Sequence, residues 1–117
     1  MRDWDALKTR YLQDTLPKRL GNLASNLARI KSRCTNPNNR EVVESVLQES
    51  KLFIEWVATE VEIELAAELV ELQIQLALWQ YSWASIWDNE LECKQISESA
   101  GVWSARVLNL SGLLSGH

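Results

Sequence analysis

The sequence is short of the residues that end helices and build turns. It holds four Gly and two Pro in 117 residues, and the run from Arg40 to Trp87 contains no Gly, Pro or Asn. Gly and Pro are the strongest local breakers of regular structure. Their scarcity argues against a chain of many short strands joined by tight turns, and it predicts long helices with few loops.

Histidine and cysteine are also scarce, which removes most His-dependent catalysis and the metal sites built from His and Cys. His117 is the only histidine. The chain therefore offers no Ser-His-Asp or Cys-His nucleophile, no HExxH zinc helix and no Glu-x-x-His pair of a di-iron bundle. Cys34 and Cys93 lack zinc-site spacing, and we expect two free, partly buried thiols rather than a disulfide or a redox pair. We predict no enzymatic activity, no cofactor and no metal site.

Long apolar runs are missing as well. No span of about 18 apolar residues occurs, so no transmembrane helix is predicted. The N-terminal stretch MRDWDALKTRYL is too charged for a signal peptide. A length of 117 residues suits one domain with a real core. We therefore expect a single cytoplasmic domain over residues 1–117, without membrane insertion.

What the chain does contain is a strong helical signal over residues 61–87. Alternating apolar and polar residues there suggest strands, but AAELVE holds no turn residue, and Ala, Leu, Glu and Gln favour helix. Two apolar stripes follow the helical period. One is Leu65, Leu69, Leu72, Leu76, Trp79, Trp83 and Ile86; the other is Ile63, Ala67, Val70, Ile74, Ala77, Tyr81 and Ala84. We expect a helix with neighbours on two sides, inside a bundle or at an oligomer interface.

Proline and loop residues set the ends of the predicted helices. A first helix covers about residues 3–34, with a kink or a new helix start near Pro17. The loop 35–39 leads to a second over about 38–87, and the last covers about 90–112. Because the loop is short, its two helices should pack antiparallel. The predicted fold is all-α, an antiparallel bundle of three to four long helices with a Trp-rich core.

The run over residues 40–87 leaves two alternatives. As one very long central helix it measures about 72 Å at 1.5 Å per residue, more than its neighbours in a monomer could cover. If the capping pattern of Thr59 and Glu62 breaks it near 57–62, it folds back within one chain. The part of this long helix that the other helices of one chain could not cover favours a homodimer, and so do the two apolar stripes.

Six tryptophans are a high count for a chain of this size. The first interpretation is that they fill interhelical space, with Gln73 and Gln80 as partners for the indole N–H groups. The alternative is a recognition surface or a pocket for an apolar ligand, since Trp is favoured at interaction hot spots. The candidate residues for this surface are Trp79, Trp83, Trp87, Tyr81, Gln73 and Gln80.

The net charge of −4 hides two parts of opposite sign. Residues 1–40 hold nine Lys or Arg against three Asp, whereas residues 41–117 hold three basic residues against thirteen acidic ones. The basic helix either lies against the acidic central helix or faces an external polyanion. The candidate basic face is Lys18, Arg19, Arg29, Lys31 and Arg33. No nucleic-acid-binding motif accompanies it, so nucleic acid is the less favoured partner.

These patterns together predict a non-enzymatic helical bundle that acts through protein–protein interaction or self-association, as a homodimer. Two alternatives stay open. One is a nucleic-acid-associated regulator that uses the basic helix, and the other is a carrier of an apolar ligand in a Trp-lined pocket. The glutamates that share one face, Glu60, Glu64, Glu68 and Glu71, are interpreted as a solvated face or a surface for the basic helix rather than as ligands of a hard cation.

Overall fold

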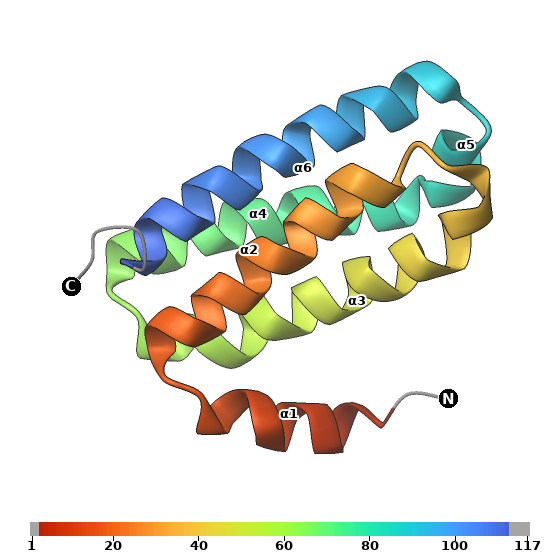
Figure 1. Cartoon of the computed structure of the whole chain (residues 1–117). Coiled ribbons are helices and arrows are strands. Elements are labelled where there is room, and N and C mark those ends of the chain that lie inside the picture. Colours follow the sequence, from red (N-terminus) through yellow and green to blue (C-terminus); the bar gives the residue numbers. More distant parts are fainter. Residues whose placement is uncertain (1–2, 113–117) are drawn as a thin grey trace.

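Helices make up all the regular structure in residues 3–112, the part of the chain that the computed structural model describes. Neighbouring long helices run in opposite directions, and α1 lies beside α3 (Figure 1). The four long helices are α2 (Leu16–Arg33), α3 (Arg40–Val57), α4 (Ile63–Tyr81) and α6 (Glu90–Ser111). The shorter elements are α1 (Trp4–Gln13), α5 (Trp83–Trp87) and the 3-10 turns η1 (Pro37–Asn39) and η2 (Ala58–Glu60).

The bend expected near Pro17 is a full break between α1 and α2. Thr15 has an extended backbone, and its side chain accepts a hydrogen bond from the Lys18 N–H at 3.4 Å. Pro17 lies in the first turn of α2, where its missing N–H leaves no helical bond unmade. Of the two alternatives at this position, the chain adopts a new helix capped by Thr15.

Tyr11 is the most deeply buried contact between helix α1 and the rest of the fold, and Leu7 also packs against the core. Tyr11 is the only buried residue of α1. Its ring stacks on Phe53 of α3 with centroids 3.9 Å apart, and its hydroxyl donates to the backbone oxygen of Arg19 at 2.9 Å. Burial raises the pKa of the Tyr11 hydroxyl, so it stays protonated as a donor.

The run over residues 40–87 is broken twice, which corrects the alternative of one very long central helix. The chain reverses through η2 and the extended Val61. This first break lies within the predicted range 57–62, but Glu62 rather than Thr59 is the N-cap residue, and it makes no side-chain cap bond. The second break, at Ser82, separates α4 from α5 and carries no Gly or Pro signal.

Helices α2 and α6 pack most extensively, because small residues line their contact. A Cβ atom on Gly101 would lie only 2.8 Å from the Lys31 Cδ atom. Two α6 hydroxyls bind α2 carbonyls directly: Ser97 donates to the Lys31 oxygen and Ser104 donates to the Ala24 oxygen, both at 2.7 Å. The buried residues of α6 are Cys93, Ile96, Ala100, Val107 and Ser111.

The centre of the fold is aliphatic, so the structure does not confirm the predicted Trp-rich core. Of the six tryptophans, Trp79 and Trp83 are buried and the other four are only partly buried. Helices that approach as closely as α2 and α6 leave little room for indole rings between them. The bulkiest fully buried side chains are Leu23, Leu27, Ile30, Leu47, Ile54, Leu69, Leu72 and Leu76.

Candidate interaction surface

Helix α4 has two apolar faces in different surroundings. The inner α4 face (Leu69, Leu72, Leu76, Trp79) is buried in the core. The outer α4 face follows the second predicted stripe from Ile63 to Tyr81, with Leu78 beside it, and no described part of the chain buries it. Its large residues are Ile63 (84 % exposed), Val70 (47 %), Ile74 (57 %), Leu78 (56 %) and Tyr81 (91 %). The alanines between them are Ala67, which is exposed, and Ala77, which is half-buried.

Polar side chains border the outer α4 face. On the α3 side, Gln73 donates to the Lys51 backbone oxygen at 3.3 Å, and the Lys51 ammonium donates to Gln80 at 2.8 Å. Gln80 also donates to Gln48 at 2.8 Å. The two glutamines therefore tie α4 to α3. They are not the predicted partners of the indoles, and the Trp83 N–H has no hydrogen-bond partner within residues 3–112.

The six residues predicted as a Trp-based surface lie in different places. Trp79 and Trp83 are buried, Tyr81 is on the outer α4 face, and the two glutamines are at its border. Trp87 packs against Trp83 with ring centroids 5.2 Å apart and lines a separate hollow of about 600 Å³ beside the start of α6. These side chains do not line one common pocket.

The same hollow is lined by the two cysteines, which are free and buried. Cys34 ends α2 and its thiol donates to the Cys93 backbone oxygen at 3.5 Å, while the Cys93 thiol donates to the Ile86 oxygen at 3.3 Å. Burial and the neighbouring Cys93 raise the pKa of Cys34 to about 12. Burial also raises the pKa of Cys93. Both thiols are therefore protonated donors at neutral pH rather than activated nucleophiles.

The basic residues of α2 do not all lie on one face. Arg19 is only 6 % exposed, and its guanidinium forms two hydrogen bonds to the Glu60 carboxylate, at 2.7 and 3.0 Å. This bidentate pair raises the pKa of Arg19 and lowers that of Glu60. Arg19 is thus removed from the candidate basic face, because it binds the turn that precedes α4. The residues left exposed are Lys18, Arg29, Lys31 and Arg33.

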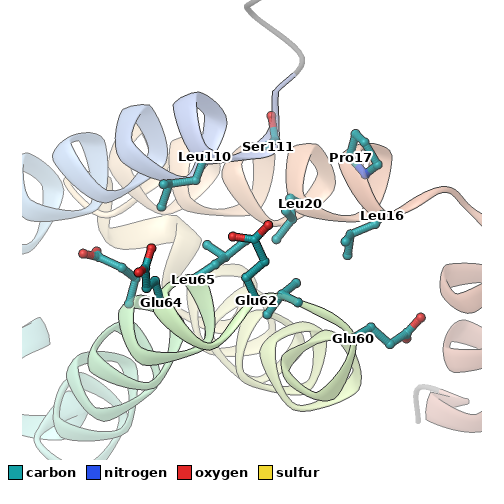
Figure 2. A pocket seen from close by; sticks show the side chains of 11 residues that line it. Leu16, Pro17, Leu20, Glu60, Glu62, Glu64, Leu65, Leu110 and Ser111 are labelled. Carbon is teal, nitrogen blue, oxygen red and sulfur yellow. The ribbon is translucent and has the colours of Figure 1, made fainter. Parts of the chain in front are cut away.

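A hollow of about 690 Å³ lies where α2 and α4 begin and α6 ends (Figure 2). Leucines and glutamates share its lining: Leu16, Leu20, Leu65 and Leu110 with Glu60, Glu62, Glu64 and Glu68. Two of these carboxylates are already paired, Glu60 with Arg19 and Glu68 with Arg106 at 2.8 Å. Within residues 3–112 no group of three or more His, Cys, Asp or Glu is arranged to hold a metal ion.

Comparison of the chain with protein-family models, curated proteins and solved structures finds no match. In the described range no helix is both long and apolar enough to cross a bilayer. The function must therefore be argued from the surfaces of this chain. Among them, the outer α4 face is set apart by a continuous apolar stripe along one helix.

Proposed function

We propose that the protein is a non-enzymatic helical bundle that works by self-association, with the outer α4 face as its contact surface. The observation that carries the proposal is the set of five large apolar side chains, 47–91 % exposed, on one helix. Single exposed hydrophobic residues are ordinary, whereas a contiguous patch of them marks an interaction site.

The size of the outer α4 face suits a dimer. Its five large side chains are about two-thirds exposed on average. At roughly 60–120 Å² for an aliphatic side chain and 150–250 Å² for Tyr, they present on the order of 400 Å² per copy. The bordering alanines and polar residues bring the contact toward the roughly 800 Å² per partner that specific interfaces bury. The face itself carries no charge, so a second copy can cover its centre without desolvating an ion.

The scaffold in this proposal is an antiparallel bundle of the four long helices. Gln73 and Gln80 fasten α4 to α3, and the Arg106–Glu68 pair fastens it to α6. These bonds fix the rotation of α4 about its own axis. The outer α4 face is therefore presented without rearrangement, and a preorganised surface loses less free energy to ordering when it binds.

The substitution Ile74→Glu tests the proposal, because it places a charge at the middle of the outer α4 face. We expect the natural chain to sediment at tens of micromolar with about twice its monomer mass of 13.4 kDa. The Ile74→Glu chain should sediment as a monomer with unchanged helical circular dichroism, since an unpaired charge is poorly tolerated in a buried contact.

Val102→Glu is the matched control, because Val102 is an exposed apolar residue (68 %) on α6 and outside the face. This variant should remain dimeric. A natural chain that stays monomeric at tens of micromolar, or equal loss of mass in both variants, would contradict self-association through α4.

A further inference from the structure

The row of second-stripe residues that forms the outer α4 face is symmetric about its own midpoint, and Leu78 lies beside this row. The positions of this row, 63, 67, 70, 74, 77 and 81, follow steps of four, three, four, three and four, and these steps read the same in both directions. The two alanines, Ala67 and Ala77, lie at equal distances from the midpoint, and so do the two most exposed residues, Ile63 and Tyr81. Alternating steps of four and three residues are the pattern of the seam in a left-handed helix pair.

We propose that two copies of the chain pair through their outer α4 faces with the two α4 helices antiparallel. This inference rests on the proposed self-association. A two-fold axis at the middle of α4 makes the contact self-complementary. Val70 of each copy then lies beside Ile74 of the other, small residues lie beside small ones, and Ile63 packs on the Tyr81 ring of the other copy.

The charge distribution along α4 selects this direction over the parallel one. The glutamates of α4 and its N-cap lie in the N-terminal half, at Glu62, Glu64, Glu68 and Glu71, and residues 72–81 hold no charged side chain. A parallel pair would place two acidic halves side by side. An antiparallel pair places each acidic half beside an uncharged one and sets the helix dipoles in opposite directions.

One like-charge contact persists in the antiparallel arrangement. Glu71 is exposed and borders the outer α4 face near its midpoint, so the Glu71 carboxylates of the two copies meet beside the axis. Glu71→Gln should therefore tighten the dimer, seen as a lower dissociation constant in sedimentation. In a parallel pair Glu71 faces small or amide side chains instead, and the same change should leave the dissociation constant unaltered.

Cysteine cross-linking tests the direction. Ala67→Cys and Ala77→Cys chains are prepared separately, mixed, and oxidised briefly with diamide, and the joined peptides are identified by mass spectrometry. In the antiparallel dimer position 67 meets position 77 of the other copy. The mixed 67–77 disulfide should exceed the like disulfides by roughly tenfold or more, because thiols held together meet at millimolar effective concentration.

Three outcomes separate the inference from the proposed function. Predominant 67–67 and 77–77 disulfides in a chain that sediments as a dimer would overturn the antiparallel direction and leave self-association intact. A monomer without specific cross-links would overturn both. Ala105→Cys, at an exposed position of α6, measures the background of random encounters; a cross-linking yield at 67–77 no greater than this background would also reject the antiparallel pair.

Discussion

The inner and outer faces of α4 carry the same kind of residue, yet one is buried and the other is exposed. Leu72 is fully buried, whereas Ile74, two residues further on, is 57 % exposed. Both belong to stripes with the same helical period. This difference shows that hydropathy identifies apolar surfaces but does not identify the molecule that covers each of them. The inner face stabilises the single chain, and in our proposal the outer face is covered by a second copy.

Truncating one residue on each face should give the largest contrast. Leu72→Ala should lower the free energy of unfolding by about 2–5 kcal/mol, because it leaves a cavity in a packed core. Ile74→Ala should change it by less than roughly 0.5 kcal/mol, as for most surface sites. Urea unfolding followed by circular dichroism, at a concentration where the chain is monomeric, measures both. Similar losses in the two variants would show that the faces are not distinguished as the structure indicates.

A smaller effect is expected at the border between the faces. Gln80 accepts from the Lys51 ammonium and donates to Gln48, both at 2.8 Å and partly shielded from water. Gln80→Ala should lower the free energy of unfolding by about 1 kcal/mol, which is the usual net contribution of such a hydrogen bond. Gln95→Ala, at an exposed position of α6, is the control and should cost nothing measurable. If the two variants unfold alike, these bonds do not hold α4 to α3.

The smallest effect is expected from the ion pair before α4. Arg19 lowers the pKa of Glu60 in the folded chain. A carboxyl whose pKa is lowered by folding contributes stability above its unfolded value, about 4.3, and this contribution is lost as the pH falls through the folded pKa. Glu60→Gln should therefore reduce the melting temperature slightly at pH 7.

At pH 3 the melting temperatures of the natural chain and Glu60→Gln should lie closer together than at pH 7, because the unfolded Glu60 is then largely protonated and the contribution of the ion pair is being lost. The effect is modest since the Glu60 side chain is 46 % exposed. Scanning calorimetry at the two pH values measures the difference. A gap that persists unchanged at pH 3 would mean that the charge of Glu60 is not what stabilises this turn.

Much of the helical framework follows from the sequence. The period of side chains around a helix is fixed by backbone geometry, so both stripes of α4 could be read directly. Pro17 has a fixed φ and no N–H, which restricts it to a kink or a first turn. The break at Ser82 could not be predicted, because none of the residues around it is a helix breaker.

The candidate site could be predicted only in part. The second stripe was identified from the sequence. Its exposure depends on the positions of α3 and α6, and these cannot be predicted from the helical period of α4 alone. Arg19 was assigned to a basic face because its neighbours in the chain are basic. Its partner, Glu60, lies 41 residues away and meets it only in the folded chain. The first interpretation of the tryptophans, that they fill interhelical space, fits Trp79 and Trp83, which are buried, but the other four are only partly buried.

The attachment of α1 implies two levels of cooperativity in this small chain. A ten-residue helix with Tyr11 as its single buried side chain is too short to persist alone in water. The residues Asp14 and Thr15 separate it from α2, and within residues 3–112 their side chains bond only to the first turns of α2. Opening of α1 requires Tyr11 to leave Phe53 and Trp56 and to give up its hydrogen bond to Arg19, while the other α1 contacts to the core are peripheral. The N-terminal arm is expected to open and close on its own, while the helices that support α4 open only together.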